Sequence, residues 1–374
     1  MKGRVIRFTT LSLGFLVCVL SACVPDTAGA DPTLVKTSSI CLDINPKQLA
    51  DYLVFDFYDK EGEAFLFGYN PVNASLDVFS FAEHRFVKAM PFSQAGPDGI
   101  ADVIAIKVIS PEEVWLATLN DFVVYDFKLG AIRNRISLDD LNDKFSLARY
   151  AYFFENHGEL VAMNDSTVLI QAGFFPLYDG ASSLHLAQMN VKSGRVAELP
   201  VRLPAWVNTA NHFGALNAIQ YGYSTGDIYY SFPFTDSLYR YRPQDKQLLP
   251  PLQLDSPRLP TVLSPYRGDG SMTALVDYAS SSSFYMGFHK IAGLENGYYR
   301  FVVSASEKRP VSFSTKLEVF NRNKLVLRHE LCNWCKTRSF VYDEKVYIFM
   351  EGTDENKLCF ETVDVSTLHP PPSQ

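Results

Sequence analysis

The side chains that could do chemistry are spread thinly along this chain. Its seven His residues do not show the His-Glu-x-x-His spacing, and the chain contains no Gly-x-Ser-x-Gly, no Walker loop and no Gly-x-Gly-x-x-Gly. Four polar residues precede segments that we expect to be the innermost strands of a ring of sheets, namely Asp102, His157, His212 and Asn217. Such groups at the mouth of a central tunnel could hold Ca²⁺ or a similar divalent cation. The alternative is that they are unrelated loop residues, and the sequence identifies no catalytic residue.

The first 23 residues have the pattern of an export signal. A basic start is followed by an apolar run over residues 8–20, which is too short to cross a bilayer core. The sequence Leu20-Ser21-Ala22-Cys23 comes next, and it resembles the signal peptides of bacterial lipoproteins, whose Cys is lipidated and becomes the first residue. The alternative is an ordinary secretory signal cut near Ala28-Gly29-Ala30.

This pattern predicts the organisation of the chain and its location. We expect a lipoprotein signal peptide over residues 1–22, a lipidated flexible tether over 23–36, the folded body over 37–368 and a disordered tail over 369–374. Several acyl chains on Cys23 would give lasting membrane attachment. The residue after Cys23 is Val24 and not Asp, and an Asp there resembles an inner-membrane retention signal. The outer membrane of the cell envelope is therefore favoured.

The charge of the chain restricts its partners. Residues 1–22 carry three basic and no acidic residues, so 31 Lys and Arg remain against 41 Asp and Glu, a net charge of −10. An acidic surface argues against a nucleic-acid partner and against electrostatic docking on anionic lipid. The membrane contact is therefore expected to be the lipid itself.

Four Cys residues remain in the body of the chain, and an exported protein is expected to pair them. A bridge between Cys41 and Cys359 would attach an N-terminal strand to the last sheet. A local bridge between Cys332 and Cys335 is a second expectation, while a redox site lacks its thioredoxin-like context. A zinc site there would need two further ligands, and His329 is the one obvious candidate.

A unit of alternating apolar and polar strands recurs along the chain, which predicts an all-β, six-bladed β-propeller. The clearest unit has strands at Val103 to Ile109, Glu113 to Leu119, Phe122 to Phe127 and Ala131 to Ser137. An N-terminal strand near Ser39 to Ile44 would complete the last blade. The 28 Phe and 20 Tyr are expected to be core material first.

The second unit also resembles a known family of folds. The phrase Gly96-Pro97-Asp98-Gly99-Ile100, followed by Val114-Trp115-Leu116-Ala117-Thr118 and Asn120-Asp121-Phe122-Val123-Val124-Tyr125-Asp126, resembles the NHL and TolB-like six-bladed propellers. Thr118 stands where that family often has Asp. By length, lipobox and repeats, the chain is also similar to six-bladed propeller lipoproteins of Bacteroidota, including a family of unknown function. The resemblance implies a fold and no activity.

Two segments depart from the repeat. Ser137 to Phe145 begins like a capped helix, and a Pro-rich crossing over residues 243–265 precedes the fifth unit. Long crossings lie on one face of a propeller and often carry function.

Three hypotheses about function remain open. The first, which we favour, is a noncatalytic envelope module that binds a protein, a peptide or a glycan and needs no cofactor. The second is a metal-dependent, lactonase-type hydrolase with a cation in the tunnel. The third is a glycan-binding accessory that uses exposed aromatic side chains such as Trp206. A solvent-exposed, coplanar pair of aromatic rings on one face would favour this third hypothesis.

Overall fold

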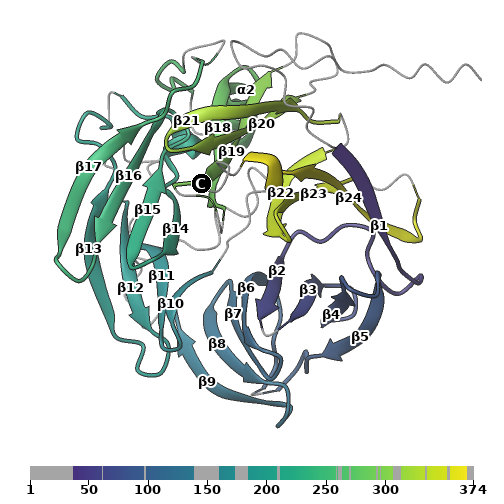
Figure 1. Ribbon diagram of the computed structural model, residues 1–374. Coiled ribbons are helices and arrows are strands. Elements are labelled where there is room, and N and C mark those ends of the chain that lie inside the picture. The colour runs from purple at the N-terminus through teal and green to yellow at the C-terminus, as the bar shows by residue number, and fades with distance from the viewer. Residues whose placement is uncertain are drawn as a thin grey trace, which may run out of the picture.

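The computed structural model shows an all-β protein. It describes residues 37–60, 62–96, 98–138, 160–172, 184–208, 211–257, 259, 263–268, 271–291, 294, 296–305, 313–332, 335–351 and 354–368. Figure 1 shows antiparallel sheets set around a centre in the order of the chain, which is the arrangement of a β-propeller. Among the described residues, no helix has both the length and the apolar character needed to span a membrane.

Four of the sheets are four-stranded meanders. They are β6 (Val103–Ser110), β7 (Glu113–Thr118), β8 (Asp121–Asp126) and β9 (Ala131–Ser137); β10 (Val161–Asn164), β11 (Thr167–Ala172), β12 (His185–Asn190) and β13 (Val196–Arg202); β14 (Gln220–Ser224), β15 (Asp227–Ser231), β16 (Ser237–Arg242) and β17 (Gln247–Gln253); and β18 (Ser283–Lys290), β19 (Tyr298–Ala305), β20 (Phe313–Asn321) and β21 (Lys324–Glu330).

An eight-stranded sheet contains the two ends of the described chain. Its strands are β2 (Phe55–Lys60), β3 (Glu63–Asn70), β4 (Ser75–Ser80), β5 (Arg85–Pro91), β1 (Thr37–Asp43), β24 (Lys357–Asp364), β23 (Lys345–Met350) and β22 (Cys335–Tyr342), in that order across the sheet. The pairing between β1 and β5 is a single parallel pair, Asp43 with Arg85. The antiparallel ladder of β1 on β24 runs from Thr37 opposite Val363 to Asp43 opposite Lys357, which confirms the expected pairing of the N-terminal strand.

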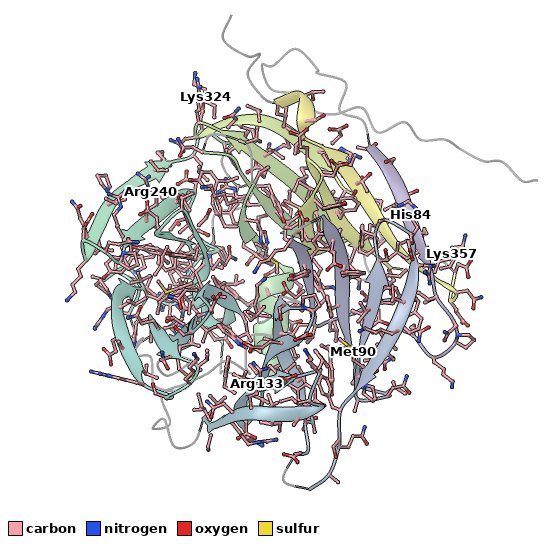
Figure 2. All side chains as sticks on the ribbon, turned by 60° about the horizontal axis from the view of Figure 1, so that its bottom comes forward. His84, Met90, Arg133, Arg240, Lys324 and Lys357 are labelled. Atoms are coloured by element: carbon pink, nitrogen blue, oxygen red, sulfur yellow. A yellow bond between two sulfur atoms is a disulfide. The ribbon has the colours of Figure 1, made fainter. Side chains whose placement is uncertain are left out.

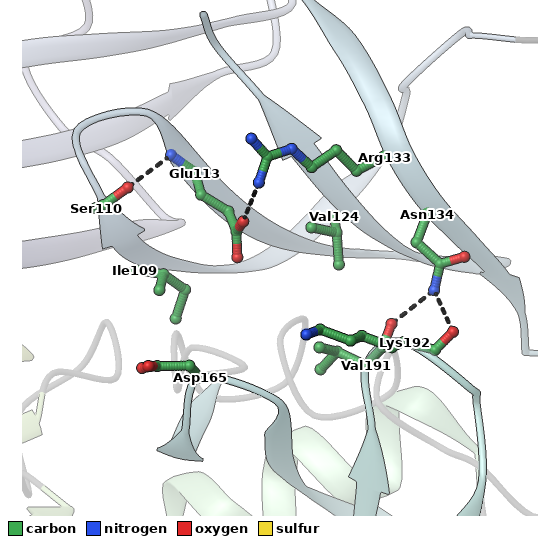
Figure 3. A pocket seen from close by; sticks show the side chains of 9 residues that line it. All are labelled: Ile109, Ser110, Glu113, Val124, Arg133, Asn134, Asp165, Val191 and Lys192. Atoms are coloured by element: carbon green, nitrogen blue, oxygen red, sulfur yellow. Dashed lines mark hydrogen bonds and ion pairs between the residues drawn. The ribbon is translucent and has the colours of Figure 1, made fainter. Parts of the chain in front are cut away.

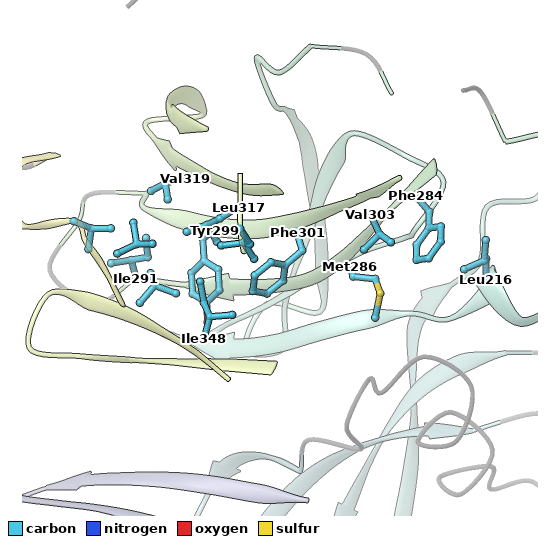
Figure 4. Close-up of a cluster of buried hydrophobic side chains, with 14 of the residues drawn as sticks. Leu216, Phe284, Met286, Ile291, Tyr299, Phe301, Val303, Leu317, Val319 and Ile348 are labelled. Atoms are coloured by element: carbon cyan, nitrogen blue, oxygen red, sulfur yellow. The ribbon is translucent and has the colours of Figure 1, made fainter. Parts of the chain in front are cut away.

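The core lies between neighbouring sheets, because both faces of the middle strands are covered. One cluster packs β18, β19 and β20 against β23 and the helical turn η2 (Gly214–Asn217), with Phe284, Phe301 and Ile348 at most 1% exposed (Figure 4). Charged side chains such as Lys324 and Lys357 point outward instead (Figure 2). The abundant Phe and Tyr are therefore largely core material.

The turn between β7 and β8 is fixed by Thr118. Its hydroxyl oxygen accepts hydrogen bonds from the backbone N–H of Asp121 at 2.9 Å and of Asn120 at 3.2 Å. A Thr can therefore do here what Asp does in the resembling family.

Some local expectations need correction. Most units were expected to hold three strands, whereas each has a further strand nearest the centre, such as β10 and β14, which are only four and five residues long. The Pro-rich crossing was expected to include Pro250 and Pro251, but these residues lie within β17. This strand is the outer one of its sheet, so one of its edges pairs with no other strand and a Pro without an N–H is tolerated there. Ser137 is the last residue of β9, and the remainder of the expected helix over 137–145, apart from Leu138, lies outside the described residues.

The connections are unequal at the two ends of the ring. Since consecutive strands are antiparallel, connections alternate between the ends. At one end they are short turns, the longest being residues 291–297 between β18 and β19. The other end carries all the longer connections, over residues 44–54, 92–102, 138–160, 173–184, 203–219 and 254–282. We call these the short-turn end and the long-connection end.

Removal of the bridge between the two chain ends should weaken the fold strongly. Cys41 and Cys359 lie opposite each other on β1 and β24 and form a disulfide across a sequence separation of 318 residues. The double variant Cys41→Ser/Cys359→Ser should lose about 3–5 kcal/mol of unfolding free energy, because this bridge closes a very long loop. Urea unfolding followed by circular dichroism measures the loss, and an unchanged midpoint would show that the strand pairing alone holds β1.

Candidate functional site

Three of the four predicted tunnel residues lie in the described part of the chain, on connections that lead into inner strands. Asp102 is exposed, has a positive φ of 52° and immediately precedes β6. His212 and Asn217 lie together on the connection 203–219 before β14, whereas His157 lies outside the described residues. Within the described part of the chain, no three His, Cys, Asp or Glu side chains gather closely enough to hold a metal ion.

His212 and Asn217 shape the connection that carries them. The Nδ1 atom of His212 accepts the backbone N–H of Gly214 at 3.4 Å, and burial together with the nearby Arg267 lowers the pKa of the ring, which keeps it neutral and able to accept. The Oδ1 atom of Asn217 accepts the N–H of Phe213 at 3.0 Å, and its side chain is fully buried. Both groups therefore stabilise the helical turn η2.

Trp206 is the most exposed aromatic anchor on the same connection. Its indole lies edge-on to Phe213, with ring centroids 5.8 Å apart, and to Phe234, at 5.4 Å, while those two Phe rings stack at 4.5 Å. The adjoining backbone is fixed by the N–H of Val207, which donates to the carbonyl of Pro204 at 2.9 Å. Although these contacts hold its plane, the indole remains 49% exposed. It is perpendicular to its neighbours, so these contacts form no coplanar aromatic pair.

A buried ionic cluster attaches the long connection 254–282 to the sheet β18–β21. Glu318 is fully buried, accepts Arg300 Nε at 2.9 Å and Arg328 Nε at 3.1 Å, and receives Ser256 Oγ at 3.1 Å from the connection. The Arg300 guanidinium also lies 3.6 Å from the centre of the Tyr285 ring. With both carboxylate oxygens bonded, this buried charge is satisfied.

The connection then continues to helix α2 (Met272–Ser280), which Ser271 caps by accepting the N–H of Ala274 at 3.2 Å.

A second buried cluster fixes the connection 44–54. Arg338 of β22 is fully buried, donates to the carbonyl of Tyr52 and contacts Asp51 Oδ2 at 2.5 Å. The hydroxyl of Tyr52 in turn donates to Asp77 Oδ2 at 2.6 Å. Burial is the main cause that raises the pKa of this hydroxyl, and the bond to Asp77 raises it further. The ring of Tyr52 packs flat on Gly68, where no side chain intervenes. The connections 254–282 and 44–54 are thus anchored by defined side-chain contacts.

The cysteines take up structural positions. Cys41 and Cys359 are bridged, and Cys332 is also disulfide-bonded, whereas the side chain of Cys335 lies outside the described residues. His329 is 2.7 Å from Glu361 Oε1, and the N–H of Cys332 donates to the other oxygen of Glu361 at 3.2 Å. A bridged sulfur is not a thiolate, so Cys332 is not a zinc ligand in this state.

The sequence did not point to a cleft between the sheets β6–β9 and β10–β13, near the short-turn end. Its volume is about 520 Å³, and Figure 3 shows its charged residues on the turns and strands that border it. The lining residues are Ile109, Ser110, Glu113, Val124, Arg133, Asn134, Asp165, Val191 and Lys192. They come from both sheets and are spread over more than 80 positions of the sequence, so no local motif predicts the cleft. We call this the inter-sheet cleft.

An ion-pair chain forms one wall of the inter-sheet cleft. Arg133 donates to Glu113 Oε2 at 2.9 Å and pairs with the buried Asp126, while Trp115 Nε1 donates to Glu113 Oε1 at 3.0 Å. Hydrogen bonding from the N–H of Leu129, reinforced by Arg133, lowers the pKa of Asp126. This wall therefore carries fixed charges at neutral pH.

Known proteins resemble this chain in sequence and in fold. A family described as a domain of unknown function, DUF4221, matches residues 34–321, which is well over half of the chain. The chain belongs to the DUF4221 family. A search of curated proteins finds no match to this DUF4221 chain.

Solved structures resemble this DUF4221 protein along nearly its whole length. A DUF4221 member from Bacteroides vulgatus is 15% identical with a TM-score of 0.68, covering 88% of this chain and 98% of its own. A Bacteroides fragilis protein whose name includes the words "exported protein" is 11% identical with a TM-score of 0.55, covering 89% and 95%. A luciferin-regenerating enzyme is 8% identical with a TM-score of 0.48, covering 87% and 95%. At these identities the likenesses to the two Bacteroides proteins show the fold alone.

The packing of Tyr52 on Gly68 can be tested with one methyl group. A Cβ on Gly68 would lie 2.3 Å from Cδ1 of Tyr52, so Gly68→Ala should displace the ring, break its bond to Asp77 and cost about 1–3 kcal/mol. Gly222→Ala is the matched control, because Gly222 is also a strand glycine and a Cβ there meets nothing within 4 Å. Chemical denaturation compares the two variants, and equal losses would contradict a specific fit of Tyr52 on Gly68.

Proposed function

We propose that this DUF4221 protein is a lipid-anchored, noncatalytic binding module of the cell envelope, built as a six-bladed propeller. The eight-stranded sheet divides at the single parallel pair of β1 with β5 into two four-stranded blades, which with the four separate sheets makes six. The last of these blades takes its outer strand from the beginning of the chain. Ring closure of this kind supports residues 37–368 as one domain.

The location follows from the start of the sequence. Residues 1–22 act as a lipoprotein signal peptide, Cys23 carries the lipid and residues 24–36 are the tether, with the outer membrane as destination. The disulfide between Cys41 and Cys359 supports an oxidising compartment, and the "exported protein" in the name of the Bacteroides fragilis neighbour agrees with a place outside the cytoplasm.

The observation that carries the binding role is the half-exposed Trp206 at the long-connection end. A fixed aromatic plane can bind a partner without losing side-chain entropy, and Trp is favoured at the centre of binding surfaces. The ring of Trp206 is held by its edge contacts with Phe213 and Phe234. Two other connections at this end, 44–54 and 254–282, are attached to the sheets by buried ionic clusters, so these described parts of the end are preorganised. A protein, peptide or glycan of the envelope is the partner class.

Hydrolysis with a cation in the tunnel is the weaker candidate. Of the four residues that could supply ligands, His212 and Asn217 already direct Nδ1 and Oδ1 to backbone N–H groups of their own connection. Both atoms are thus engaged in holding the turn η2, which supports binding over catalysis as the role of this end.

The lipid anchor is tested by fatty-acid labelling. Cells that express the full chain should incorporate radiolabelled palmitate into it, and Cys23→Ser should abolish the label and shift the protein to the aqueous phase of a detergent partition. Cys18→Ser, within the same signal peptide, serves as the control and should leave both readouts unchanged. A wild-type protein that is exported without label would instead support ordinary cleavage near Ala28-Gly29-Ala30.

The binding end is tested by site-specific photo-crosslinking in the native cell. Benzoylphenylalanine at Trp206 should trap an envelope partner, while the same group at Leu248, which is similarly exposed at 50% on the outer strand β17, should not. Adducts from position 248 alone, or equal adducts from both positions, would contradict binding at the long-connection end.

A further inference from the structure

The inter-sheet cleft has the size and construction of a small-molecule site, separate from the long-connection end. Its volume of about 520 Å³ lies within the range usual for ligand pockets, roughly 300–1,000 Å³. Its apolar lining comes from Ile109, Val124 and Val191, of which Val124 and Val191 are buried. Ile109 is only half-buried, so it is the apolar lining residue that a ligand body could still cover.

The turns that border the cleft are held in place by hydrogen bonds. Asn134 Nδ2 donates to the carbonyls of Val191 at 2.6 Å and Lys192 at 3.1 Å, which ties β9 to the turn of the next sheet across the cleft. The N–H of Val191 donates to the carbonyl of Ser166 at 2.9 Å, so the turn that holds Asp165 is fixed to the same segment. The backbone that carries Lys192 and Asp165 is thus held in place before a ligand arrives.

Charges of both signs remain available in the cleft. Lys192 and Asp165 form no ion pair with another described residue, although both line the cleft. In Figure 3 the Lys192 ammonium extends into the open space, and the Glu113 carboxylate points toward the same space from the opposite wall. Each oxygen of Glu113 accepts one bond within the protein, and a carboxylate oxygen can accept a second.

We propose that the inter-sheet cleft binds a small zwitterion with an apolar body, of the class of a free α-amino acid with an apolar side chain. The ligand carboxylate would pair with Lys192, and its ammonium with Glu113 and Asp165. The apolar side chain would cover Ile109, the apolar lining residue that is still partly exposed. Pairing both ligand charges matters because each adds a charge-assisted contact, and a ligand with one charge can make only one of the two.

Calorimetric titration of the purified full chain tests the proposal with three ligands of similar shape. Leucine should bind, whereas 3-methylbutylamine, which lacks the carboxylate, and 4-methylpentanoate, which lacks the amine, should each bind at least tenfold more weakly. Glycine, which has both charges and no apolar body, should also bind at least tenfold more weakly. Failure of leucine to bind at about 10 mM, a concentration that reveals even very weak ligands, would overturn the proposal. Equal affinity for leucine and any one of the other three would also overturn it.

Variants assign the charges. Lys192→Met should weaken leucine binding at least tenfold and leave 3-methylbutylamine unchanged, and Asp165→Asn should weaken leucine and leave 4-methylpentanoate unchanged. Lys88→Met is the control, because Lys88 is likewise exposed but lies on the outer strand β5. All three positions are exposed, so each variant should fold, which circular dichroism checks. Unchanged leucine binding in Lys192→Met would contradict the assigned carboxylate contact.

Discussion

The ladder between β1 and β24 is the interaction on which the rest of the structure depends. The first described strand is the outer strand beside the last three, so the ring is complete only when both ends of the chain have been placed. Seven residue pairs hold this ladder, and the disulfide between Cys41 and Cys359 lies within it. Without β1, the polar edge of β24 would be open to pairing with other chains.

The buried charges show how the ring keeps its long connections in order. Glu318 and Arg338 each lie inside the sheets and reach a segment of a connection, Ser256 in one case and Asp51 in the other. A buried charge is costly unless it is paired, so each connection is held in the arrangement that satisfies the charge. The connections are therefore positioned by specific polar contacts as well as by burial of apolar area.

The sequence predicted the middle and outer strands well, because a near-continuous apolar run such as Val114 to Ala117 is typical of a strand that is buried on both faces. It predicted the innermost strands less well. Strand β10 is only four residues long, and β14 contains Gly222, so neither shows a periodic pattern of useful length. Helix α2 was missed because it is short and lies in the connection 254–282, after the Pro-rich crossing.

The candidate sites were harder to predict than the fold, for a physical reason. The local bonds that engage His212 and Asn217 depend on the turn η2, which has no pattern in sequence. The inter-sheet cleft is assembled from residues of two sheets, which only the register of the sheets brings together. In contrast, Trp206 was singled out by its residue type alone. The structure buries Phe213 of the same connection and leaves Trp206 half-exposed, a difference that no local pattern predicts.

The direction of β1 gives the molecule a polarity. This strand runs from Thr37 to Asp43 and leads into the connection 44–54, so Thr37 stands at the short-turn end, opposite Val363. Residues 24–36 can reach about 45 Å when fully extended. A lipid at Cys23, as proposed, would therefore attach the ring to the membrane through its short-turn end. Trp206 lies at the opposite end of the ring.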